Sequence, residues 1–178
     1  AGTVSGESIG IHQPAFPELI AIPGTPVYFA PQAKANYFYY DGLYWAYQQD
    51  NWYAGTWYDG PWGLIDPDAV PSPLLRVPVR YFRNPPAYFR AWSSDSPPRW
   101  DEFWGAAWQQ RRPTWNDWSR HAGPAPAPLP LFQGKYANAD YPRPDQQHRI
   151  ADRLQRYEPG DHLVKQTRQA LRHGALAR

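Results

Sequence analysis

Short runs of aromatic and aliphatic residues recur between positions 19 and 82, and Gly, Pro, Asp or Asn separates each run from the next. Runs of this length with such punctuation are typical of short antiparallel strands. They predict strands at 19–22, 27–30, 37–40, 43–48, 52–57, 62–65 and 74–82. Asp41-Gly42 lies between two aromatic runs and predicts a tight hairpin turn, because Gly accepts the positive φ that such a turn requires.

A tripeptide within this region is repeated. Tyr40-Asp41-Gly42 recurs 18 residues later as Tyr58-Asp59-Gly60, and a Trp follows each copy, at Trp45 and at Trp62. Two or three units of this kind are fewer than a solenoid requires. The repeat therefore does not predict a repeat architecture.

Beyond residue 82 the hydrophobic pattern changes to a helical period. Trp100, Phe103, Trp104, Ala107 and Trp108 lie at i, i+3, i+4, i+7 and i+8, which predicts one short Trp-rich helix near 98–112. Apolar residues return at helical spacing near the C-terminus, where Pro159-Gly160 divides them into two stretches. These stretches predict a helical tail.

The pattern divides the chain into four parts. We predict an N-terminal arm at 1–18, an antiparallel β unit at 19–82, a Pro/Trp-rich extended segment at 83–144 and a helical basic tail at 145–178. The 22 Pro and 13 Gly residues favour turns and polyproline-like segments. The expected fold class is mainly β, a small antiparallel aromatic-rich meander or barrel with long Pro-rich arms, one short Trp-rich helix and a C-terminal helical tail.

Aromatic residues make up 17% of the chain, with 10 Trp and 13 Tyr. Each large ring buries about 150–250 Å², so rings can form a core where aliphatic residues are few. Alternate residues of a strand share a face, so the same rings also fit an exposed platform for sugars, Pro-rich peptide or a protein. Both interpretations stay open for Tyr37, Tyr39, Tyr44, Trp45, Trp52, Trp57, Tyr58 and Trp62.

The Pro-rich arms suit a chain that wraps around a neighbour. A Pro-rich segment loses little entropy on ordering, because its φ angles are already set. We therefore expect the arms to contact other protein chains of an assembly through apolar anchors. The predicted anchors are Phe16, Tyr88, Phe89, Trp92, Leu129 and Phe132.

Charge is unevenly distributed along the chain. Residues 1–70 contain one Lys and seven acidic residues, whereas residues 71–178 contain 17 basic and nine acidic residues. Arg predominates in the basic part and suits contact with phosphates, carboxylates and aromatic faces. The tail is expected to face a partner or an anionic envelope surface, and nucleic acid is not an expected partner. The tail residues concerned are Arg149, Arg153, Arg156, Arg168 and Arg172.

The sequence contains little catalytic chemistry. Cysteine is absent, which excludes disulfides, thiol catalysis and zinc–thiolate sites. The five His residues form no metal-binding motif, and Asp66-Pro67-Asp68 fits a turn better than a calcium site. Asp117, Ser119 and His121 lie too close in sequence for a nucleophilic triad. We predict that the chain is not an enzyme and that it has no catalytic residues, metal or cofactor.

Part of the chain resembles a known group of proteins. The segments PVYFAP, NYFYYDGLYWAYQQDNWYAGTWYDGPWGLID and PLLRVPVRYFRNPPAYFRAW, within about residues 26–145, resemble uncharacterised exported proteobacterial proteins rich in Tyr, Trp and Gly, described as YXWGXW-like. The resemblance implies export and carries no activity. The W-Y-x-x-G rhythm is also loosely similar to choline-binding repeats of cell-wall proteins, but the repeats here are few and irregular.

Two further features agree with export. The chain contains no Met, and Ala1-Gly2-Thr3 suits the residues that follow a signal-peptidase cleavage site. No apolar run approaches the roughly 20 residues of a membrane span. We predict a non-catalytic protein of the periplasm or cell surface, an accessory or structural subunit wrapping a larger bacterial envelope or extracellular assembly. The alternative is glycan or cell-wall binding through an exposed Trp/Tyr platform.

Overall fold

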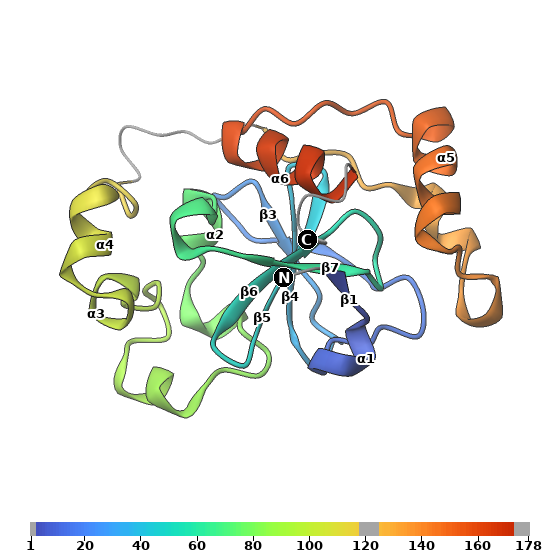
Figure 1. Ribbon diagram of the computed structural model, residues 1–178. Helices are drawn as coiled ribbons and strands as arrows, with labels where there is room; N and C mark the ends of the chain where they lie inside the picture. Colours follow the sequence, from blue (N-terminus) through green and yellow to red (C-terminus); the bar gives the residue numbers. More distant parts are fainter. Residues whose placement is uncertain (1–2, 118–124, 173–178) are drawn as a thin grey trace.

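The computed structural model describes residues 3–117 and 125–172, and an antiparallel sheet of seven strands lies at its centre (Figure 1). Strands β2 to β7 follow one another across the sheet, and β1 joins it beside β7. The strands are β1 Thr3–Val4, β2 Ile20–Ala21, β3 Val27–Phe29, β4 Asn36–Tyr40, β5 Leu43–Gln48, β6 Asn51–Gly55 and β7 Trp62–Ile65. The predicted antiparallel, aromatic-rich meander is confirmed.

The β4–β5 hairpin has the tight turn that Asp41-Gly42 predicts. Tyr40 pairs with Leu43, so Asp41 and Gly42 form the two-residue connection between the strands. Asp41 has a φ of 52° and Gly42 a φ of 96°, so both adopt the left-handed conformation of a primed turn. The turn fixes the register of the two central strands.

Both faces of the sheet are buried. Phe38, Trp45 and Ala54 are cross-strand partners on one face and belong to the first core. Their neighbours Tyr37 and Tyr53 point to the opposite face and belong to a second core. Since successive side chains of a strand point to opposite faces, the aromatic runs fill both cores at once.

The middle of the chain covers the first face. It contains η1 Pro67–Ala69, α2 Ser72–Leu75, η2 Val79–Tyr81, η3 Ala87–Ala91, α3 Trp100–Trp104 and α4 Ala106–Arg111. Trp100 is fully buried, stacks on Trp104 at 4.6 Å between ring centroids and donates its indole N–H to the Leu75 carbonyl. The predicted helix near 98–112 is present in two pieces, broken at Gly105, whose φ is 92°.

The strand predicted at 74–82 is absent. Leu74 and Leu75 end α2, and the N–H groups of Val79 and Arg80 donate to the carbonyls of Ser96 and Ser94. Prolines at 71, 73 and 78 remove the donors that a sheet ladder needs. The apolar residues of this segment instead belong to the first core, and they lie in the short helical turns α2 and η2 and between them.

Two distant segments cover the second face. The first is α1 Gly6–Ile9 with the residues that follow it up to β2, and the second runs from residue 125 through η4 Leu131–Lys135 and η5 Asn138–Asp140. Tyr28 and Tyr39 donate their hydroxyls to the carbonyls of Ala127 and Pro128. The Pro-rich segment is therefore bonded to the sheet through tyrosine hydroxyls.

The C-terminal part is helical, as predicted. It contains α5 Pro144–Leu154 and α6 His162–Arg172. Asp161 accepts the N–H of Leu163 and so caps the start of α6. Among the described residues, no helix is both long enough and apolar enough to span a bilayer.

Candidate functional site

The rings predicted as a platform belong to the interior. Each is at most 1% exposed, so the prediction of an exposed platform is wrong. The physical reason is that segments of the chain cover both faces of the sheet, which leaves no face for stacking on a ligand. The buried rings are Tyr37, Tyr39, Tyr44, Trp45, Trp52, Trp57, Tyr58 and Trp62.

The predicted partner anchors contact the chain's own rings. Phe16 meets the edge of Tyr58 at 5.6 Å, Phe132 meets Trp57 at 5.8 Å, and Leu129 packs against the second core. On the other face, Phe89 is buried, and Tyr88 and Trp92 pack against the first core. These six side chains therefore pack within their own chain, and contact of the five half-buried ones with another chain stays a prediction. These segments cover the two aromatic faces of the sheet.

The basic tail is partly engaged within the chain. Arg168 donates to the Tyr157 carbonyl at 3.3 Å and to the Glu158 carboxylate at 2.7 Å, and Arg172 pairs with Asp152. The Arg168 side chain is 15% exposed and does not face outward as predicted, because this carbonyl and carboxylate bind it. The Arg172 side chain is 40% exposed, so it stays at the surface although Asp152 pairs with it.

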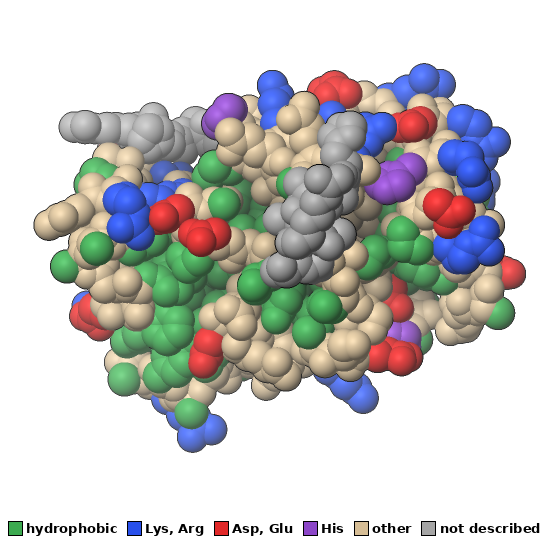
Figure 2. Space-filling view, in the orientation of Figure 1, with side chains coloured by type: hydrophobic (Ala, Val, Ile, Leu, Met, Phe, Trp, Pro, Cys, Tyr) green, Lys and Arg blue, Asp and Glu red, His purple; other side chains and the backbone are tan. Residues whose placement is uncertain are grey.

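Four of the predicted tail arginines are exposed, namely Arg149, Arg153, Arg156 and Arg172. Basic side chains gather over α5 in the space-filling view (Figure 2). Arg149 and Arg153 border an open groove of about 740 Å³ that Tyr136 and Ile150 also line. The last six residues of the tail, 173–178, lie outside the described residues.

The first Tyr-Asp-Gly turn holds the tail onto the sheet. The Asp41 carboxylate is buried and accepts the N–H groups of Gly160 and Asp161, at 3.0 and 2.7 Å, together with the Tyr157 hydroxyl. The Tyr40 hydroxyl donates to the Asp161 carboxylate at 2.7 Å. This copy of the repeat is a structural junction.

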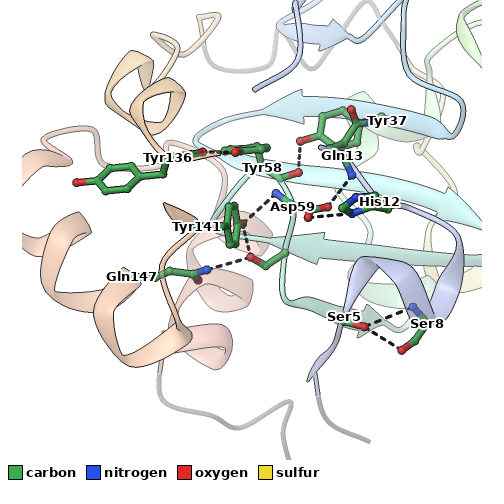
Figure 3. Close-up of polar contacts among 11 residues, drawn as sticks. Ser5, Ser8, His12, Gln13, Tyr37, Tyr58, Asp59, Tyr136, Tyr141 and Gln147 are labelled. Carbon is green, nitrogen blue, oxygen red and sulfur yellow. Dashed lines mark hydrogen bonds and ion pairs between the residues drawn. The ribbon is translucent and has the colours of Figure 1, made fainter. Parts of the chain in front are cut away.

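The second Tyr-Asp-Gly turn, which connects β6 to β7, binds two other segments (Figure 3). One Asp59 carboxylate oxygen accepts the Gln13 N–H at 2.7 Å, and the other contacts Nδ1 of His12 at 3.1 Å. The Asp59 N–H donates to the Tyr141 hydroxyl at 3.0 Å. The turn thus joins the N-terminal segment to the segment that precedes α5.

The carbonyl of Gly60 completes this junction. It accepts the Tyr141 hydroxyl at 2.5 Å and one N–H of the Gln147 amide at 3.1 Å. The same Gln147 nitrogen also donates to the Pro142 carbonyl at 3.1 Å. Gln147 is buried, so its amide fixes the start of α5 against the turn.

A pocket of about 330 Å³ opens beside the His12–Asp59 pair. Three segments line it: residues 3–7 together with His12, the 59–61 turn, and the stretch from Tyr141 to Gln147. This volume lies within the range of small-molecule sites, about 300–1,000 Å³. We define this cavity as the second-turn pocket.

The Asp59 carboxylate beside the pocket is partly removed from water. Burial raises the pKa of Asp59, the Gln13 N–H and His12 act in the opposite direction, and the Glu7 charge raises it further. Burial also raises the pKa of Tyr141. Titratable groups with shifted pKa values in a concave, mostly apolar pocket are the usual signature of a binding site.

The pair fixes the protonation pattern of the His12 ring. A carboxylate only accepts hydrogen bonds, so Asp59 places a proton on Nδ1 of His12. In the neutral imidazole, Nε2 is then an acceptor. Among the described residues, no three His, Asp or Glu side chains are arranged to hold a metal ion.

The sequence did not predict this site. His12 and Asp59 are 47 residues apart, and neither lies in a recognisable catalytic or metal-binding motif. The one available signal was the repeated Tyr-Asp-Gly, whose two Asp residues both accept bonds from distant segments. Ser119 and His121 of the triad considered above lie outside the described residues.

The chain was compared with protein-family models, with curated proteins and with solved structures. No family model, no curated protein and no solved structure matches the chain. The assignment of a function therefore depends on the geometry of the second-turn pocket.

Proposed function

We propose that this chain is a non-catalytic, exported binding protein whose ligand occupies the second-turn pocket. The observation that carries the proposal is the His12–Asp59 pair, which points acceptor groups toward a cavity bounded by three separate segments. The proposal of export is supported by the sequence resemblance.

The surroundings of His12 favour binding over catalysis. A His–Asp pair acts in nucleophilic catalysis when a hydroxyl or thiol lies within hydrogen-bond reach of the imidazole. Among the described residues, no hydroxyl bonds to His12. The hydroxyls of Ser5 and Ser8 bond to each other at 2.9 Å, and Ser5 caps α1.

A role as subunit of a larger assembly is a second candidate function. The arms are committed to this chain's own core, so a partner would dock on the surface and not be wrapped. Exposed Arg149, Arg153 and Arg156 favour a partner with an acidic surface. Such a contact weakens with salt, because the Debye length falls from about 10 Å at 0.1 M to about 3 Å at 1 M.

Blocking the pocket tests the main proposal. Val4 lines the pocket and is 36% exposed, whereas Leu64 is 40% exposed on the neighbouring strand β7 and does not line it. Val4→Trp should abolish the binding of pocket ligands found in a screen of cationic, neutral and anionic small molecules, and Leu64→Trp should preserve it. Absence of any ligand that Val4→Trp displaces would overturn the proposal.

A further inference from the structure

We propose that the second-turn pocket selects an organic cation, a primary ammonium group attached to a short apolar body. This inference rests on the proposed function and names the ligand class of the same site. It follows from three properties of the pocket: which hydrogen-bonding groups are already used, what charge remains, and what forms the walls.

The buried donors at the pocket are already used. The Tyr141 hydroxyl donates to the Gly60 carbonyl, and the Gln147 amide donates to Gly60 and Pro142. Prolines at 61, 142 and 144 also line the pocket, and proline has no backbone N–H. A ligand that needs donors, such as a carboxylate or a phosphate, finds few of them here.

The acceptors at the pocket retain capacity. An ionised carboxylate has about four lone-pair sites, and Asp59 uses two of them, for Gln13 and His12. The Glu7 carboxylate has no hydrogen-bond or ion-pair partner among the residues that the structure describes. With Nε2 of His12, these groups match the three N–H donors of an ammonium.

The charge of the pocket lining has one sign. Among the described residues that line it, Glu7 and Asp59 are the acidic ones and none is Lys or Arg. Glu7 lies close enough to raise the pKa of Asp59, so the two carboxylates act on the same space. A cation bound between them relieves this repulsion, whereas an anion adds to it.

The walls suit a short apolar body. The Tyr141 ring and the three prolines provide apolar surface beside the carboxylates. An ammonium near an aromatic ring also gains from the negative face of the ring. A volume of about 330 Å³ holds a small amine and excludes a long polymer segment.

Three probes that share a phenylethyl body and differ in the charge of the head group test the inference: 2-phenylethylammonium, 2-phenylethanol and 3-phenylpropionate. Binding is measured by titration calorimetry on the full chain at neutral pH. We expect the ammonium to bind at least about tenfold more tightly than the alcohol, a difference of about 1.4 kcal/mol. The carboxylate should bind most weakly.

Two substitutions assign the binding to the two carboxylates. Asp59→Asn keeps the shape of the side chain and should weaken ammonium binding about tenfold, and Glu7→Gln should weaken it about threefold. Glu18→Gln is the matched control, because Glu18 is exposed and does not line the pocket. Alcohol binding should change little in all three variants.

The outcomes separate this inference from the proposed function. If the alcohol or the carboxylate binds as tightly as the ammonium, and Val4→Trp displaces it, the pocket is a ligand site and the choice of a cation is wrong. Ammonium binding that is indifferent to both Asp59→Asn and Glu7→Gln also overturns the inference. If none of the three probes binds in a manner sensitive to Val4→Trp, both statements fail.

Discussion

Asp41 and Asp59 occupy the same position in the two Tyr-Asp-Gly turns and have different surroundings. Asp41 is 1% exposed and accepts three donors from residues 157–161. The Asp59 side chain is 18% exposed and borders the second-turn pocket. The first copy stabilises the fold, and the second is available to a ligand.

Replacing Asp41 should therefore destabilise the protein. Asp41→Asn keeps the size of the side chain but puts an NH₂ group opposite one of the donors. We expect the free energy of unfolding to fall by about 2–3 kcal/mol, since hydrogen bonds to charged groups contribute about 1.5–3 kcal/mol. Urea unfolding followed by Trp fluorescence measures the change.

Asp95 provides the control for this substitution. Its side chain is 73% exposed and pairs with Arg80 on the surface. Asp95→Asn should change stability by less than about 1 kcal/mol, because exposed ion pairs contribute little. Equal effects of Asp41→Asn and Asp95→Asn would show that Asp41 does not hold the tail.

Replacing Asp59 should have the opposite consequence. Burial raises the pKa of Asp59 above its ordinary 3.8, so ionisation of this carboxyl disfavours the folded state. The protonated Asp59 carboxyl therefore contributes stability to the fold below its ordinary pKa. This contribution is lost as the pH rises through the pKa that Asp59 has in the folded state. Asp59→Asn should therefore be as stable as the wild type, or more stable, at neutral pH.

The measurement compares the urea midpoints of wild type and Asp59→Asn at about pH 4 and about pH 7. The urea midpoint of Asp59→Asn should exceed that of the wild type by more at the higher pH than at the lower pH. A large loss of stability at neutral pH in Asp59→Asn would instead assign Asp59 a structural role like that of Asp41.

Strands β2 to β7 could be predicted from the sequence, but β1, within the predicted N-terminal arm, and the burial of the two sheet faces could not. Tyr37 and Phe38 are both aromatic and point to opposite faces, so apolar periodicity gives the strand and says nothing of which side is covered. The covering segments come from residues 6–19, 66–117 and 125–141, and their docking depends on tertiary contacts such as the hydrogen bond from Tyr39 to Pro128.

The candidate site was beyond sequence reasoning for a related reason. His12 lies in a segment that reads as a polar arm, and its partner Asp59 lies in a turn. Each residue has an ordinary local explanation, and only the fold brings them together. Conversely, the segment 74–82 shows strand-like alternation, but Pro78 within it cannot donate a backbone hydrogen bond to a sheet.

Trp45 tests whether the rings are core residues. Its side chain is fully buried and its indole N–H donates to the Tyr40 carbonyl at 3.2 Å. Trp45→Ala should lower the free energy of unfolding by about 3–5 kcal/mol, as large-to-small substitutions of buried aromatic residues do. A stable, fully folded Trp45→Ala variant would restore the platform interpretation, because an exposed ring is removed without such a loss.

The buried tyrosines predict a steep loss of stability in alkali. Burial raises the pKa of Tyr37, Tyr39 and Tyr44 above the ordinary value of 10.0, and Tyr88 has a pKa of about 12. Stability from such groups is present below pH 10 and falls as pH rises above it, because only the unfolded chain ionises freely. Tyrosinate absorbance at about 295 nm should rise together with the loss of the folded circular dichroism signal. Gradual ionisation of all tyrosines in a folded protein would contradict this.

The two outermost strands of the sheet, β1 and β2, have two residues each. An outer strand exposes backbone N–H and C=O groups to which a strand of another molecule can add, and the risk of fibril growth rises with its length. Here each border offers only a short ladder, and Pro23 and Pro26 lie in the connection between β2 and β3. A chain with so many aromatic residues in extended conformation is thereby protected from stacking with its own copies at high concentration.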